Sequence, residues 1–345
     1  MDLTTWLLSR TPVRPLVATT VGGTGVRLAV EREMRRRGWR PALNPAEANL
    51  LIVTGPDDPA MTPFVEAVWE QIPVPRARVS LETPAEVATA LSEAERRMRS
   101  RDEQHPASTP EPAAAKAEDH HDHAQHGEHH EHDMADMEMP GGVPMADRAD
   151  DRDGLKLDRL AVPLGPLLPA WPPGLLVRTT LQGDVIQEAT AEAVMTAAHG
   201  PAPFWDSVTS DRIAARRLDS CARLLTIAGW EYAAVTAARL RDDLLSGADV
   251  EARFARWARR VRRSRVLRWS LTGIGAHAGS DALDRLTHWI DQATAAGASD
   301  STATEDPAEI LDALPSLLTG TEFATARLVV ASLDPDLERL RVSHG

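Results

Sequence analysis

The sequence is almost free of cysteine, because Cys221 is the single cysteine among 345 residues. One cysteine cannot form an internal disulfide, and it cannot supply the four thiolates of an iron–sulfur cluster or a cysteine-rich zinc site. The apolar segment around Cys221, residues 217–227, favours a buried and unreactive thiol. The sequence therefore predicts a protein with no iron–sulfur cofactor of its own.

Long apolar runs are also missing, since no stretch approaches the roughly 20 residues that a membrane-spanning helix needs. Residues 1–15 contain the acidic Asp2 and only a short apolar patch, which predicts no secretory signal. Aromatic residues make up only 4% of the chain, so leucine, valine and alanine must provide most of the core. These features favour a cytoplasmic protein whose contact with a membrane, if it has one, is peripheral.

Negative charge is concentrated in one segment. The net charge is −13, and residues 102–153 hold 15 acidic side chains against three basic ones, a balance of −12. Proline, alanine, histidine and methionine are frequent in this segment, and no hydrophobic periodicity is visible. This composition predicts a disordered linker over residues 101–154. The chain is thus expected to divide into a domain at 1–100, the linker, and a domain at 155–345.

The first domain alternates short apolar runs with amphipathic segments. Strands are predicted at residues 16–20, 50–54 and 78–81, and helices at residues 26–37, 61–72 and 83–98. Strand–helix alternation predicts an α/β fold with a parallel sheet and helices on its faces.

A glycine-rich turn, Gly22-Gly23-Thr24-Gly25, joins the first predicted strand to its helix. Backbone amides at such a position can hold an anion. The turn lacks the lysine and hydroxyl residues of a P-loop and the glycine spacing of a dinucleotide-binding fingerprint. A tight structural turn is therefore the favoured interpretation.

The second domain begins with strands and continues with helices. Apolar runs at residues 175–181 and 184–189 flank Gln182-Gly183 and predict a β-hairpin. From residue 211 onward the pattern is helical, with one more strand expected at residues 327–331. These patterns predict a mainly helical α+β domain with a small hairpin.

The linker contains the densest group of potential metal ligands. Neutral imidazoles bind nickel, zinc and copper(II), and thioethers suit copper(I). The candidate ligands are His120, His121, His123, His126, His129, His130, His132, Met134, Met137 and Met139. Two interpretations stay open: a site for loosely bound Ni, Zn or Cu, or a solvated acidic spacer that binds metal incidentally.

A basic amphipathic helix is predicted at residues 251–269, which contain eight arginines beside an apolar stripe. Such a helix can contact an anionic membrane surface or an acidic partner, or it can be a solvated face over a buried stripe. The candidate contact residues are Arg253, Arg256, Trp257, Arg259, Arg260 and Arg263. No nucleic-acid-binding module accompanies the helix, so nucleic acid is not an expected partner.

The run NPAEANLLIVTGPDDPAMTPFVEAVWEQIPVPRARVSL, residues 44–81, resembles the 20-kDa cluster-bearing subunit of NADH:quinone oxidoreductase and the small subunit of related nickel–iron hydrogenases. The shared positions are Ala48, Ile52, Val53, Gly55, Met61, Pro63, Trp69, Gln71, Pro73, Pro75 and Arg76. The resemblance covers most of residues 16–100 and implies a flavodoxin-like α/β fold. That family holds a four-iron cluster through cysteines in loops that here correspond to residues 21–26 and 80–84, and neither loop has a cysteine.

The second domain resembles the partner of that subunit, the 49-kDa or hydrogenase large-subunit type. Residues 162–189 are similar to the opening strands of that family, with Trp171-Pro172 in place of its His-Pro. Residues 327–340 resemble its closing strand and Asp-Pro-Cys-x-x-Cys motif. Here Asp334-Pro335 is retained, while Asp336 and Arg339 take the cysteine positions. The resemblance therefore implies that nickel–iron binding has been lost.

The cofactor ligands are missing from both halves, whereas the strand and turn patterns remain. The resemblance therefore implies a non-catalytic accessory or structural subunit of a complex-I-like or hydrogenase-like membrane oxidoreductase, peripheral on the inner face of the cell membrane. Its expected partners are complex-I-like or antiporter-like membrane subunits, and the two halves with each other. The alternative is a metal-handling or metalloenzyme-maturation protein that uses the His/Met tract. A subunit that still acts on quinone is a third interpretation, against which the missing ligands argue.

Overall fold

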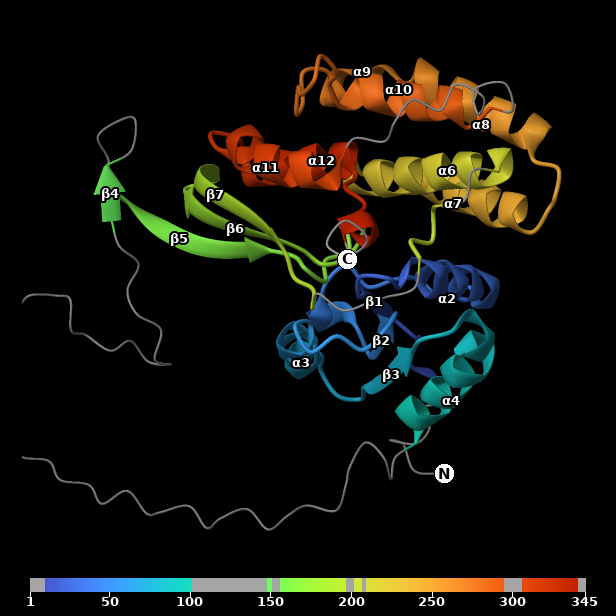
Figure 1. Ribbon diagram of the computed structural model, residues 1–345. Helices are drawn as coiled ribbons and strands as arrows, with labels where there is room; N and C mark the ends of the chain where they lie inside the picture. Colours follow the sequence, from blue (N-terminus) through green and yellow to red (C-terminus); the bar gives the residue numbers. More distant parts are fainter. Residues whose placement is uncertain are drawn as a thin grey trace, which may run out of the picture.

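The computed structural model describes residues 10–100, 148–150, 156–196, 202–206, 209–294 and 306–340. An α/β part (residues 10–100) lies against a helical part (residues 156–340), which opens with an antiparallel sheet (Figure 1). The predicted fold class, a parallel α/β sheet followed by a mainly helical α+β region with a hairpin, is confirmed. The predicted linker, residues 101–154, lies outside the described residues except for the short strand β4 (Arg148–Asp150).

The α/β part is a parallel sheet with helices on both faces. Its strands are β1 (Pro15–Thr19), β2 (Leu50–Thr54) and β3 (Ala77–Leu81), in the order β1-β2-β3. Every residue of β2 is buried, as a continuous apolar run predicts for a central parallel strand. Helices α2 (Thr24–Arg37) and α4 (Val87–Arg99) pack on one face, and α3 (Thr62–Gln71) packs on the other. Short 3₁₀ turns, η1 (Pro45–Glu47) and η2 (Pro84–Glu86), precede β2 and α4.

The strand order defines a crevice at one end of this sheet. A flavodoxin-type sheet has the order 2-1-3-4-5, and the order here corresponds to that sheet without its second, edge strand. In place of that strand, residues 39–49 return to the sheet through η1. Because α2 and α3 leave toward opposite faces, the carboxyl ends of β1 and β2 form the switch point at which open α/β sheets bind ligands.

The helical part begins with an antiparallel sheet of β5 (Lys156–Leu164), β6 (Leu175–Gln182) and β7 (Val185–Ala193). The predicted hairpin is present, with Gln182 opposite Val185 and Gly183-Asp184 as its turn. The helices that follow are α6 (Ser210–Ile227), α7 (Glu231–Leu245), α8 (Glu251–Arg263), α9 (Arg265–Leu271), α10 (Ala282–Gln292), α11 (Pro307–Leu318) and α12 (Phe323–Leu333), with η5 (Leu337–Arg339) at the end. Among the helices that the structure describes, none combines the length and apolar composition that crossing a membrane would require.

The strand predicted at residues 327–331 is wrong, because this segment is the centre of helix α12. Adjacent Val329 and Val330 favour a strand locally. However, Ala326, Val329, Val330 and Leu333 recur at helical spacing, and all four are buried. Packing of α12 against α6 and α10 therefore overrides the β preference of two residues.

Candidate functional site at the interface between the two parts

The glycine turn between β1 and α2 lies at the switch point, and two of its glycines are required by close packing. A Cβ atom on Gly23 would lie 2.3 Å from the carbonyl oxygen of Thr54. A Cβ atom on Gly25 would lie 2.9 Å from the ring of Phe204, which belongs to the helical part. These glycines let the loop after β2 and an aromatic ring approach the turn, as expected of a tight structural turn.

The amino end of α2 is occupied by a carboxylate from the same chain. Glu338 accepts a hydrogen bond from the backbone N–H of Thr24 at 3.1 Å and another from the N–H of Phe204 at 2.8 Å. The N-terminus of a helix carries a partial positive charge that favours an anion. Glu338 supplies that anion from within η5, so the position considered above for anion binding is filled by the protein itself.

Three segments that are far apart in sequence meet beside this contact. The turn at Thr24, the segment around Pro173, and residues 334–338 line one small pocket, together with Trp205, Arg216 and Arg223. The free space is about 20 Å³, little more than the roughly 10–15 Å³ that one ordered water molecule needs. The pocket is therefore too small for an organic or metal-cluster cofactor.

Ion pairs close this pocket. Arg216 lies 3.2 Å from Asp336, and Arg223 pairs with Asp334, which also accepts a hydrogen bond from the Ser220 hydroxyl. Burial raises the pKa of Asp336, and the nearby charge of Arg216 opposes that shift. Asp334 and Asp336, which lie in the segment that resembles the family's closing motif, are therefore both paired with arginine side chains.

Trp171, at the position of the His in the His-Pro pair, has a packing role. Its side chain is buried, and its indole N–H donates to the carbonyl oxygen of Leu175 at 2.7 Å. Gly165 approaches the ring closely, since a Cβ atom there would lie 2.5 Å from the indole nitrogen. The tryptophan therefore fixes the turn that leads into β6.

A buried network of charges joins α2 to α6 and α7. Arg241 and Asp219 are each only 1% exposed and form an ion pair. Arg27 of α2 reaches Asp219 at 2.7 Å, and Arg241 reaches Glu31 of α2 at 3.0 Å. Arg35 of α2 pairs with Asp242, which also pairs with Arg241. The network therefore alternates acids and arginines across the interface, with α2 beneath α6 and α7 (Figure 1).

The charges in this network hold its carboxyl groups ionised. Burial alone would raise the pKa of Asp219, but the charges of Arg27, Arg241 and Arg223 outweigh burial and lower it well below its usual range. Burial likewise opposes ionisation of Glu31, yet Arg27 and Arg241 lower its pKa to about 2. Both carboxylates therefore stay charged at any pH near neutrality.

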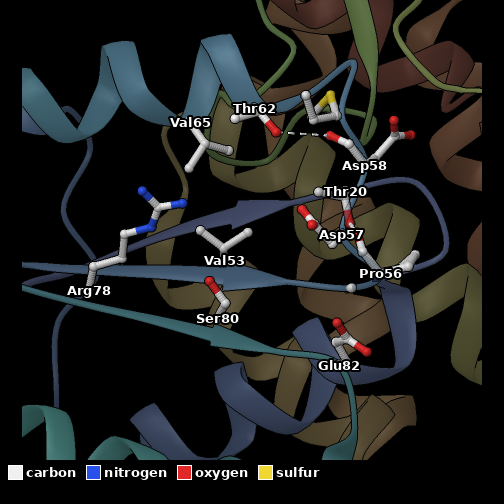
Figure 2. A pocket seen from close by; sticks show the side chains of 12 residues that line it. Thr20, Val53, Pro56, Asp57, Asp58, Thr62, Val65, Arg78, Ser80 and Glu82 are labelled. Atoms are coloured by element: carbon white, nitrogen blue, oxygen red, sulfur yellow. Dashed lines mark hydrogen bonds between the residues drawn. The ribbon is translucent and has the colours of Figure 1, made fainter.

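A larger pocket of about 330 Å³ opens between α3 and the carboxyl ends of β2 and β3 (Figure 2). Its wall includes apolar Val53 and Val65, and the exposed carboxylates of Asp57 and Glu82. Neighbouring Asp58 is buried and accepts hydrogen bonds from the backbone N–H and hydroxyl of Thr196. Sequence reasoning missed this pocket because its lining comes from separate strands, loops and a helix that only the fold brings together. Its mixed lining, which also includes Arg78, suits a small polar molecule.

The helix predicted at residues 251–269 is present as α8 and α9, but one of its predicted contact residues is buried. Trp257 is 5% exposed, and its indole N–H donates to the carbonyl oxygen of Ala233 on α7 at 3.0 Å. Together with Phe254 it belongs to the core between α7 and α8. The prediction that Trp257 contacts a partner is therefore wrong, because the apolar stripe of α8 is used up in packing.

The predicted arginines are exposed, but they differ in their neighbours. Arg253 pairs with Asp243 at 2.6 Å, and the Arg260 guanidinium lies 5.0 Å from the ring centroid of Tyr232. In the part of the chain that the structure describes, Arg256, Arg259 and Arg263 have neither an ion-pair nor a ring partner. Three of the five predicted arginines are therefore available to a partner.

Metal-binding geometry is not found among the described residues, which contain no group of three or more His, Cys, Asp or Glu side chains placed to hold an ion. The candidate ligands from His120 to Met139 lie outside those residues. Cys221 is fully buried, and burial raises the pKa of its thiol. This thiol is therefore protonated and inaccessible.

Comparison with family models, with curated proteins and with solved structures finds no match to this chain.

Proposed function

We propose that this chain is a non-catalytic structural subunit of a complex-I-like or hydrogenase-like membrane oxidoreductase, with the cofactor ligands lost. One observation carries the proposal. Three segments at or next to positions that resemble cofactor-binding positions of the two families line one pocket between the two parts: the turn at Thr24, Pro173 beside the Trp171-Pro172 pair, and the Asp334-Pro335 turn. The loop at residues 80–84 is not among them, since Ser80 and Glu82 line the other pocket. Distant segments that share one lost role would be expected to meet in space if the resemblance reflects common ancestry.

The chemistry at that meeting point supports a structural role. Two carboxylate–guanidinium pairs and Glu338 occupy the space, and burial of these groups requires them to stay paired. Because no thiolate is present and the free volume is minimal, electron transfer through this position is not expected. The remaining task of the interface is to hold the two parts together, and fusion in one chain raises their effective concentration for each other.

The proposed setting is the inner face of the cell membrane, with complex-I-like or antiporter-like membrane subunits as partners. The exposed arginines of α8 support a peripheral contact, because helix α8 lies in the layer of the helical part that is away from the α/β part (Figure 1). No nucleic-acid partner, iron–sulfur cluster or nickel–iron centre is proposed.

The test is recovery of partners from the cells that make the protein. The tagged chain would be purified from mildly cross-linked membranes, and we expect multi-span oxidoreductase or antiporter-like subunits to be recovered with it. The purified chain should contain less than one iron per molecule. Recovery of no membrane subunit would contradict the structural role, and about four iron and four sulfide per chain would contradict the loss of the cluster.

The His/Met tract supports a second candidate function, handling of Ni, Zn or Cu, because seven histidines and three methionines lie within residues 120–139. Residues 119–139 can be replaced by a histidine-free acidic segment of equal length. If the tract is a spacer, the variant loses metal binding and keeps its place in the assembly. If cells then lose a metalloenzyme activity while the assembly stays intact, metal handling is the better function.

A further inference from the structure

Two apolar side chains project from α9 into solvent. Trp269 is 84% exposed and Val266 is 75% exposed, and they are the two most exposed large apolar side chains among the described residues. Their spacing of three residues places them on one face of the helix. The buried residues of α9, Leu267 and Leu271, anchor the opposite face in the core, so the helix presents this pair on a fixed support.

Arginines without acidic partners lie in the same helix as that pair and in the helix before it. Arg256, Arg259 and Arg263 of α8 and Arg265 of α9 are exposed, and in the described ranges none of them forms an ion pair. Two neighbouring arginines do have partners: Arg262 pairs with Asp291, and Arg268 donates to the carbonyl oxygen of Arg262 at 3.0 Å. Helices α8, α9 and α10 form the layer of the helical part that is farthest from the α/β part (Figure 1).

We infer that this surface, formed by Arg256, Arg259, Arg263, Arg265, Val266 and Trp269 and here called the α8–α9 surface, binds an anionic lipid bilayer. The indole of Trp269 and the side chain of Val266 enter the interfacial layer, and the guanidinium groups contact lipid phosphates. Tryptophan suits this layer because its ring is largely apolar while its N–H needs a polar partner. Arginine suits it because its planar donors match phosphate oxygens.

A bilayer fits the α8–α9 surface better than the acidic segment of the same chain does. Residues 102–153 carry a balance of −12 and could pair with the arginines, but they contain no Trp, Phe, Tyr, Leu or Ile to pack on Trp269 and Val266. An anionic bilayer serves both groups at once, with phosphates for the arginines and an apolar boundary for the indole. Repulsion from the acidic segment is screened beyond about 10 Å at 0.1 M salt.

Lipid binding by the α8–α9 surface would explain how the chain attaches to the membrane at which the proposed function places it. Only the identity of that membrane in the cell rests on the proposed function. Lipid binding itself requires no other protein. A test with purified chain and pure lipid therefore judges the α8–α9 surface separately from membership of an oxidoreductase assembly.

The experiment is sedimentation of the full chain with vesicles of phosphatidylglycerol and phosphatidylcholine at low salt. We expect the chain to bind anionic vesicles and not pure phosphatidylcholine vesicles. We also expect release in 0.5 M NaCl, because the distance over which charges attract falls from about 10 Å at 0.1 M salt to about 3 Å at 1 M. Glycerol phosphate at millimolar concentration should not compete, which distinguishes a bilayer from a free phosphate. A full chain that does not sediment with anionic vesicles would overturn the inference.

Matched variants locate the contact. We expect Trp269→Ser, and separately Arg259→Gln with Arg263→Gln, to lower vesicle partitioning by roughly tenfold, since a bilayer contact combines burial of the indole with charge attraction. The controls are Leu43→Ser and Arg32→Gln with Arg40→Gln, which change an exposed apolar side chain and two exposed arginines in the α/β part. Equal losses in the controls, or no loss in the α8–α9 variants, would also overturn the inference.

Fluorescence provides a readout that a folding defect would not imitate. Brominated lipids should quench part of the tryptophan emission of the wild-type chain, and Trp269→Phe should remove that part while keeping most of the binding. If the wild type binds vesicles but recovers no membrane subunit from cells, the proposed function fails and the lipid surface stands. If membrane subunits are recovered but vesicles are not bound, the lipid surface fails and the proposed function stands.

Discussion

Arginine has opposite environments in two regions of this molecule. Between α2 and the pair α6 and α7, Arg241 is buried and its charge is matched by Asp219, Glu31 and Asp242. On α8, Arg256 and Arg259 are exposed and face no acid in the described residues. A buried charge must be paired to be tolerated, whereas an exposed one costs little when it is alone. The comparison teaches that the role of an arginine here depends on what other segments bring beside it.

The largest expected effect comes from leaving a charge buried without its partner. Arg241→Ala removes one of the guanidinium groups that neutralise Asp219 and leaves the buried acids Asp219, Glu31 and Asp242 with one positive charge fewer among them, so we expect the free energy of unfolding to fall by about 3–5 kcal/mol. Urea denaturation followed by circular dichroism measures this change. The matched control is Arg256→Ala on α8, which should change stability by less than about 0.5 kcal/mol. Similar losses of stability in the two variants would contradict the claim that buried and exposed arginines contribute differently to stability.

Removing both charges sharpens the comparison. In the double variant Arg241→Met with Asp219→Leu, no uncompensated charge remains at the centre of the network, because Arg27 keeps Glu31 and Arg223 keeps Asp334. We expect the double variant to be more stable than the sum of the single losses by about 1–3 kcal/mol. Strict additivity in a denaturation double-mutant cycle would show that the two side chains act independently.

Acid should weaken the interface before it affects the exposed helices. The folded-state pKa values of Glu31, about 2, and of Asp219 are depressed by the arginines. Groups with depressed pKa values add stability above their unfolded values near 4, and this stability is lost as pH falls through the folded values. From pH 5 to pH 2 we expect a loss on the order of 2 kcal/mol from this pair.

Unfolding measured as a function of pH tests this expectation. The double variant Arg241→Met with Asp219→Leu should show a shallower decline than the wild type between pH 5 and pH 2, because the coupled carboxylate is gone. Equal slopes for both proteins would contradict the assignment of acid sensitivity to this network.

A smaller effect is expected for the hydrogen bond between Thr196 of the helical part and buried Asp58 of the α/β part. Thr196→Val removes the hydroxyl that donates to Asp58 and keeps the backbone N–H that also donates to it. A hydrogen bond to a charged group contributes about 1.5–3 kcal/mol, so the loss should lie near the lower end of that range. Thr287→Val on α10, whose exposed hydroxyl bonds within its own helix, is the control in thermal unfolding. A loss no larger than that of the control would contradict a role for Asp58 in joining the two parts.

The smallest effect on stability is expected on α8. Arg259→Gln with Arg263→Gln should leave the midpoint of thermal unfolding almost unchanged, within about 0.5 kcal/mol, because neither side chain has a partner to lose. Increasing salt should alter the unfolding of this variant and of the wild type equally. A marked destabilisation would mean that these arginines support the fold, and that they are not free to bind elsewhere.

Several elements were predictable because their signals are local. The continuous apolar run at residues 50–54 predicted a central parallel strand, and the structure buries all of it in β2. Gly183 between two apolar runs predicted the hairpin of β6 and β7. The absence of four cysteines excludes a four-thiolate cluster without reference to any fold.

Periodicity alone could not tell a buried tryptophan from an exposed one. Trp257 was assigned to a contact surface because its helix is basic and amphipathic, but the apolar stripe of α8 packs against α7. Trp269 was not singled out, yet it is the exposed one. The outcome depends on which neighbour covers each face, and that neighbour is distant in sequence.

The sequence by itself determined the fold class and the lack of thiolate ligands, since each follows from composition or from patterns only a few residues long. Only the tertiary structure decided that Glu338 occupies the amino end of α2, that Arg241 is buried among three acids, and that Trp269 remains in water. These outcomes depend on contacts between segments up to 314 residues apart. Such contacts form only when apolar faces pack, and no local pattern records which charged side chains that packing brings together.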